Sequence, residues 1–122
     1  MIKTTIEKII NSQEAVNKLA DKPLPVKISY RLAKLIKAIE SELEVFEGER
    51  KKLLERYGTI NEEKQCYNIP NDKAEKFNAE FAQLIGTETE LSAEKIDLSN
   101  EDIKLTAKEF IALEPFIKFE EE

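Results

Sequence analysis

The chain has 122 residues, of which 41% are apolar and 36% are charged, and its net charge is -6. This length predicts one domain, residues 1–122, with a single hydrophobic core. No apolar run approaches the roughly 20 residues that cross a bilayer, and residues 1–10 do not follow the pattern of a signal peptide. We therefore expect a cytoplasmic protein without membrane contacts, which agrees with Cys66 being the only cysteine.

Charge is divided unevenly between the two halves of the chain. Residues 1–58 carry 12 Lys+Arg and 9 Asp+Glu, a net charge of +3, whereas residues 59–122 carry 7 and 16, a net charge of -9. Opposite charges allow the two halves to attract each other in the fold. An acidic chain lacks the sustained basic surface that a phosphate backbone requires, so we do not expect non-specific nucleic-acid binding.

Apolar residues at helical spacing predict an opening helix over residues 5–20, with Thr5 or Ser12 as its N-cap. The next segment, residues 21–25, breaks this helix. Pro23 cannot continue it, and Pro25 suits the first turn of a following helix because its missing N–H is harmless there.

The following helix, Val26–Tyr57, is the clearest prediction in the sequence. Its apolar residues recur every three or four positions. They are Ile28, Leu32, Leu35, Ile36, Ile39, Leu43, Phe46, Leu53, Leu54 and Tyr57. Such a helix is about 45 Å long, which is more than a small compact domain needs. We therefore expect part of it to pack against another helix or another subunit, and we expect Gly58 to end it as a left-handed C-cap.

A second long element is predicted after a polar connection, residues 59–71, which contains a short strand at residues 66–69. A helix is expected over residues 72–85, with Asn71 as its N-cap and Gly86 at its end. Its apolar face is formed by Ala74, Phe77, Phe81, Leu84 and Ile85. We expect this helix to fold back antiparallel along Val26–Tyr57.

Beyond residue 86 the apolar pattern changes to alternation, which predicts a small sheet of two or three strands. The alternating residues are Thr87, Thr89, Leu91, Ile96, Leu98, Ile103 and Leu105. Thr106 and Glu109 have the spacing of a capping box, so a last helix is predicted over residues 107–114. Phe116, Ile117 and Phe119 follow Pro115 and are expected to dock on the rest of the protein.

The predicted fold is therefore α+β and α-dominated. It consists of a long antiparallel helical hairpin with a short N-terminal helix, a small β-sheet and a C-terminal helix.

Two parts of the sequence resemble a group of phage proteins. The first is Leu-Pro-Val-Lys-Ile-Ser-Tyr-Arg-Leu-Ala-Lys-Leu at residues 24–35, with Phe46-Glu47, Arg50 and Leu-Glu-Arg-Tyr-Gly at residues 54–58. The second is Leu105-Thr106 followed by Leu-Glu-Pro-Phe-Ile at residues 113–117. Together they resemble small hypothetical proteins encoded by tailed phages and prophages, over most of the chain. The resemblance implies a phage accessory protein in a bacterial host cytoplasm, and it implies no functional residues.

Several kinds of chemistry have no support in the sequence. The chain contains no histidine, which removes the usual general base and the commonest metal ligand. Its three glycines are isolated, so there is no phosphate-binding loop. The acidic segment at residues 97–102 lacks the spacing and the glycine of a calcium loop. We therefore expect a protein that is not an enzyme and has no cofactor.

The charges of the long helix are sorted into blocks. Every charge between residues 22 and 39 is positive, every charge in residues 40–49 is negative, and residues 50–52 are basic again. Lys27, Arg31 and Lys34 share one face of the first turns, beside Tyr30, at a helix end that repels cations. This arrangement suits a phosphate or nucleotide. The alternative is that these side chains face water or the acidic half of the chain.

Arg50 lies on the apolar stripe of the same helix. It either pairs with a carboxylate such as Glu47 or Glu80, or reaches an anionic ligand at a subunit boundary. The candidate ligand-binding residues are Lys27, Tyr30, Arg31, Lys34 and Arg50.

Two functions are consistent with these features. The leading hypothesis is a non-enzymatic phage or prophage accessory protein of the anti-defence type, which inhibits or sequesters a host protein or an anionic small molecule. The alternative is a virion structural or assembly factor that oligomerises through the long helix. The first requires a concave basic site and the second an exposed apolar patch. We also expect a homo-oligomer, most simply an antiparallel dimer in which residues 27–37 of one copy face residues 40–49 of the other.

Overall fold

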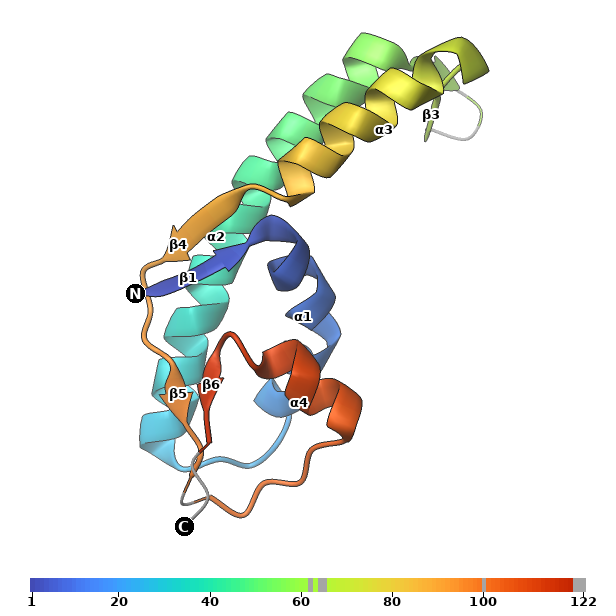
Figure 1. Ribbon diagram of the computed structural model, residues 1–122. Helices are drawn as coiled ribbons and strands as arrows, with labels where there is room; N and C mark the ends of the chain where they lie inside the picture. Colours follow the sequence, from blue (N-terminus) through green and yellow to red (C-terminus); the bar gives the residue numbers. More distant parts are fainter. Residues whose placement is uncertain (62, 64–65, 100, 120–122) are drawn as a thin grey trace.

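The computed structural model describes residues 1–61, 63, 66–99 and 101–119, and it has a base and a projecting arm (Figure 1). Both parts share helix α2 (Val26–Tyr57), whose N-terminal part lies in the base and whose C-terminal part lies in the arm. The other helices are α1 (Ile6–Ala20) and α4 (Ala107–Leu113) in the base, and α3 (Asn71–Ile85) in the arm. Helix α3 runs antiparallel to α2, so the predicted α-dominated α+β fold and its helical hairpin are confirmed.

The two short helices begin at the threonines that the sequence indicated. The Oγ1 of Thr5 accepts a hydrogen bond from the backbone N–H of Lys8 at 3.3 Å, and α1 follows. The hydroxyl of Thr106 accepts from the N–H of Glu109 at 3.1 Å, and α4 follows. Ser12, the other candidate cap, lies buried inside α1 and donates to the carbonyl of Ile9 at 2.8 Å.

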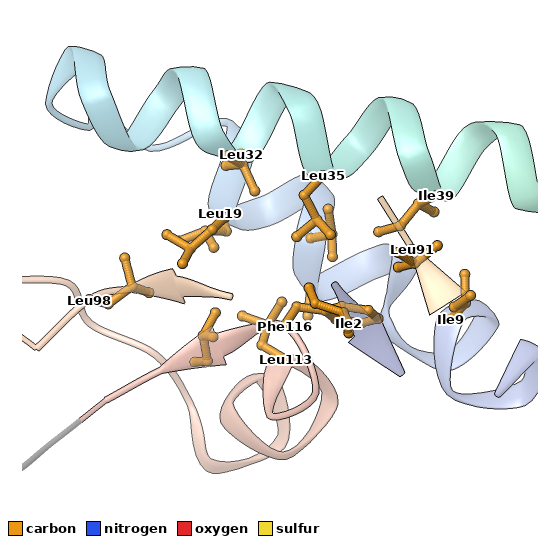
Figure 2. Packing of buried hydrophobic residues seen from close by; sticks show 14 of the residues in the cluster. Ile2, Ile9, Leu19, Leu32, Leu35, Ile39, Leu91, Leu98, Leu113 and Phe116 are labelled. Carbon is orange, nitrogen blue, oxygen red and sulfur yellow. The ribbon is translucent and has the colours of Figure 1, made fainter. Parts of the chain in front are cut away.

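The hydrophobic core lies in the base, between α2 and the elements around it (Figure 2). Leu32 and Leu35 point from α2 into a cluster that also receives Leu19 from α1. The segment after α4 completes it, since Phe116 is fully buried. Burying a side chain of this kind stabilises a fold by about 1.5–3 kcal/mol. The expected docking of the C-terminal apolar residues is therefore confirmed for Phe116 and Ile117, while Phe119 stays half exposed against Phe110.

The strands form three two-stranded sheets within the part of the chain that the structure describes. The antiparallel pairs are β1 (Ile2–Thr5) with β4 (Glu88–Leu91), and β2 (Thr59–Asn61) with β3 (Cys66–Asn68). The parallel pair is β5 (Ile96–Asp97) with β6 (Ile117–Lys118). Strands β4 and β5 therefore pair with the two ends of the chain and not with each other, and residues 103–105 form no strand. Burial explains the choice, because Ile2 and Leu91 are opposite each other and both face the core.

Two predicted helix ends were wrong in detail. Gly58 has φ -112° and ψ 168°, which is extended backbone and not a left-handed cap, because the chain continues directly into β2. Glycine is still needed there, since a Cβ would lie 2.8 Å from the Leu54 carbonyl oxygen and 3.2 Å from that of Asn68. Helix α3 begins at Asn71 itself, with Pro70 in the N-cap position and no side-chain cap.

The arm has a thinner apolar seam than the base. Phe46 is the last buried residue of α2, and no residue of α3 is buried. An aromatic contact joins the two helices, because the ring centres of Phe46 in α2 and Phe81 in α3 are 6.2 Å apart. Within α3, Phe77 stacks on Phe81 with ring centres 5.9 Å apart. Two helices without a third layer leave both edges of their shared seam accessible to water.

Candidate functional site

The basic residues at the start of α2 lie on an exposed helix surface. Lys27, Tyr30, Arg31 and Lys34 are all exposed, and α2 has neither a side-chain cap nor an acidic residue in its first turn. The ammonium group of Lys34 lies 4.8 Å from the centre of the Tyr30 ring. The structure therefore places these four residues together, as the sequence predicted, but on a convex surface. None of the clefts described below is lined by any of them.

Part of the basic charge acts within the chain, on Asp97 of β5. Hydrogen bonds from Ser99, including its backbone N–H at 2.9 Å, lower the pKa of Asp97 most. The positive charges of Lys118 and Arg31 lower the same pKa further. Arg31 is thus close enough to the acidic half of the chain to interact with it. This arrangement is the alternative that the sequence offered to a bound phosphate or nucleotide.

Arg50 is separate from the other candidate ligand residues. It follows Arg31 by 19 positions in the same helix, which corresponds to about 28 Å along the axis. Its Nε donates to Oε2 of Glu47 at 3.2 Å, and its side chain is 43% exposed. The five candidate residues therefore do not form one site. Arg50 is a half-exposed member of a local ion pair and not a buried arginine.

A cleft of about 650 Å³ lies between α2 and strand β3 of the arm. It is lined by Glu47, Gly48, Arg50, Lys51, Leu54, Cys66 and Tyr67. The thiol of Cys66 is free and exposed. Leu54 and Tyr67 give this cleft apolar surface, and two cations, Arg50 and Lys51, lie beside them. The cleft can therefore accommodate an amphipathic protein segment.

The opposite side of the arm contains a polar cluster around Glu80 of α3. Hydrogen bonding to this carboxylate, followed by burial, raises the pKa of the Tyr57 hydroxyl. Arg56 pairs with Oε1 of Glu80 at 3.5 Å, while Oε2 of Glu80 is buried and has no hydrogen-bond partner among the residues that the structure describes. Tyr57 is only half-buried, so the sequence overestimated its place in the core.

Two clefts in the base contain lysines that the sequence did not single out. One, of about 520 Å³, runs along the outer surface of β1 and β4, and the other, of about 480 Å³, lies between α1 and the end of α4. Lys3 and Lys8 line both, and Lys95 and Ile111 line the second. No sequence spacing connects these residues, because β1, α1 and α4 meet only in the folded chain.

The described residues contain no group of three or more His, Cys, Asp or Glu side chains that could hold a metal ion. In the same part of the chain, no helix combines the length and the apolar character needed to cross a membrane. Comparison with protein-family models, with curated proteins and with solved structures finds no match.

Proposed function

We propose that this protein is a non-enzymatic interaction protein of the assembly type, and that its arm binds a partner protein. The resemblance to phage and prophage proteins implies an accessory protein in a bacterial host cytoplasm, and a virion structural or assembly factor is the function of this kind that a protein-binding arm favours.

The observation that carries this proposal is the incomplete burial of the arm. Phe77, Phe81, Leu84 and Ile85 line the seam between α2 and α3, yet none of them is buried. At the tip, Ile60 of β2 is 63% exposed. Apolar residues that remain accessible along one projecting element are typical of protein-binding surfaces. A partner that covers the seam would bury them.

The basic block, which consists of Lys27, Arg31 and Lys34 at the start of α2, gives weaker support to the other function, sequestration of an anionic small molecule. A sequestering site needs walls that surround the ligand. Lys27, Arg31 and Lys34 extend from a convex helix surface, and Tyr30 already stacks on Lys34. A host protein with an acidic surface remains compatible with this block, and the experiment below distinguishes it from an assembly partner.

Photo-cross-linking in cells that express the phage or prophage genes tests the proposal. A photoreactive amino acid at Ile60 or Tyr67 probes the arm, and the same group at exposed Lys108 in the base serves as the matched control. We expect a discrete cross-linked protein from the arm positions and none from the control. Mass spectrometry of the cross-link then identifies the partner.

Each outcome has a definite meaning. A capsid or tail component linked to the arm supports the assembly function. A host defence protein linked to the arm or to the basic block replaces it with the inhibitory function. Equal labelling from arm and base positions overturns the proposal that the arm is the binding element.

A further inference from the structure

One face of α2 is exposed along the middle of the helix. Five buried residues of α2 are each followed, two positions later, by an exposed residue, and two positions rotate a helix by about 200°. The buried residues are Ile28, Leu32, Leu35, Ile39 and Phe46. The exposed residues are Tyr30, Lys34, Lys37, Ser41 and Gly48. The base and α3 thus contact one side of α2 and leave the opposite side, the outer face, open to solvent.

Gly48 lies on this outer face without any need for glycine inside the protomer. It lies within the continuous helix Val26–Tyr57, where glycine is disfavoured relative to alanine. A Cβ built on Gly48 would meet no other atom within 4 Å. Gly58 differs, because neighbouring carbonyl oxygens exclude a side chain there. A glycine with empty space around it on an exposed helix face allows the backbone of a second helix to approach closely.

The charges of the outer face complement those of a reversed copy of the same face. Lys37 and Glu44 are seven positions apart, which is about two turns, so both point outward on the same side of α2. Neither forms an ion pair within the described residues. A two-fold axis beside Ser41 places Lys37 of each copy against Glu44 of the other. The same register places Gly48 against exposed Ala33, so the two backbones meet at small residues.

We infer that the outer face of α2 binds a second copy of this chain, antiparallel, with the two-fold axis between Glu40 and Ser41. The order of charges is self-complementary about this point, which is the property that a two-fold interface requires. This inference goes beyond the proposed function, because it concerns a different face of α2 from the arm seam. It also assigns one register to the expected antiparallel dimer.

The size of the face sets the expected strength of the dimer. Residues 30–51 span about 33 Å, and a helix is about 10 Å wide, so each copy contributes an area on the order of 330 Å². Stable interfaces bury about 800 Å² per partner. The dimer is therefore weak and reversible, and its detection requires protein at up to about 500 µM.

Charge reversal tests the register. Sedimentation equilibrium is measured for the parent, for Lys37→Glu, for Glu44→Lys and for the double variant, with Lys104→Glu as a control for net charge. Each single reversal creates two like-charge contacts per dimer, so we expect its Kd to rise about tenfold. The double variant restores both contacts with inverted sign, so its Kd returns close to the parent value. A double variant as weak as the singles overturns the register, and a monomeric parent at about 500 µM overturns the dimer.

Disulfide trapping provides an independent measurement. In a Cys66→Ser background, Ala33→Cys and Gly48→Cys are made in separate chains and then mixed under mild oxidation. The inferred register brings position 33 of one copy next to position 48 of the other, within disulfide reach, so the mixture gives a cross-linked dimer. Either variant alone gives none. Equal cross-linking in the unmixed samples overturns the inference. The arm proposal stands or falls separately on the cross-link from Ile60, because Tyr67 lines the same cleft as Gly48.

Discussion

Tyr30 and Lys34 stack on each other on the outer face of α2, with the ammonium group 4.8 Å from the centre of the ring. An exposed contact of this kind is worth about 0.5–1 kcal/mol. The aromatic ring that a bound nucleotide would stack on therefore already has a cationic neighbour from its own chain. Arg31, the next residue of α2, interacts with Asp97. The basic block thus has partners within the protein and does not require an anionic ligand to explain it.

We predict that phosphate, nucleotides and cyclic nucleotides leave the melting temperature unchanged. A ligand that binds only the folded protein at one hundred times its Kd would stabilise it by about 2.7 kcal/mol, which a thermal-shift assay detects. The matched variant is Lys27→Ala/Arg31→Ala. A rise with the parent that disappears in this double variant and in added salt would contradict the prediction and restore the sequestration hypothesis.

Two glycine-to-alanine changes in and beside α2 are predicted to have opposite effects. Gly58→Ala forces a Cβ to within 2.8 Å of the Leu54 carbonyl oxygen, so we expect a loss of about 1–3 kcal/mol. Gly48→Ala adds a methyl group to empty space in a helix interior, so we expect a gain of about 0.5–1 kcal/mol. Urea unfolding of both variants measures the difference. If Gly48→Ala and Gly58→Ala destabilise the protein by similar amounts, the close contact at Gly58 does not explain the loss of stability.

The helices could be predicted from the sequence because their signals are local. The 3.6-residue period of α2 and the threonine caps of α1 and α4 each involve residues a few positions apart. The strand pairs could not be predicted in the same way. Ile2 meets Leu91 across nearly the whole chain, and Ile96 meets Ile117, so their pairing depends on which surfaces the core must cover.

The candidate site was partly predictable. The helical spacing of the sequence correctly predicted that four residues share one face of α2: Lys27, Tyr30, Arg31 and Lys34. The rise of about 1.5 Å per residue is enough to show that Arg50 lies far from them along the same helix. Sequence spacing does not show whether a helix face is convex, covered or lined by a cleft. That property depends on where β3 and Tyr67 lie relative to α2, and these are positioned by tertiary contacts.

Arg50→Leu is expected to leave the protein folded, with a change in stability within about 0.5 kcal/mol. Its ion pair with Glu47 is partly exposed, and pairs of this type three or four residues apart on a helix contribute only about 0.3–0.5 kcal/mol. Urea unfolding compares it with Glu47→Gln, which breaks the same pair. If the folded Arg50→Leu protein loses the photo-cross-link from the arm, Arg50 takes part in partner binding. If the cross-link is unchanged, the role of Arg50 is confined to its ion pair within the helix.

The carboxylate of Asp97 is predicted to stabilise the fold only while it is ionised. Its folded-state pKa lies below the ordinary value of 3.8, mainly because Ser99 donates hydrogen bonds to it. A lowered pKa contributes stability above the unfolded value, and this contribution is lost as pH falls through the folded value. Asp97→Asn should therefore be less stable than the parent at neutral pH, with the difference shrinking below pH 3.8. A constant difference between neutral and acidic pH would contradict this assignment.

Gly48→Gln is predicted to stabilise the protomer while weakening the dimer. Glutamine forms helices better than glycine by about 0.6–0.8 kcal/mol, and a Cβ at position 48 meets no atom within 4 Å in the protomer. In the antiparallel dimer, the longer side chain would meet the backbone around Ala33 of the second copy and separate the helices. Thermal unfolding at low concentration measures the first effect, and sedimentation equilibrium at high concentration measures the second. A matched change at an exposed α2 position beyond the contact, Glu55→Gln, should leave association unchanged. If Gly48→Gln associates as well as the parent does, no second backbone approaches α2 at this residue.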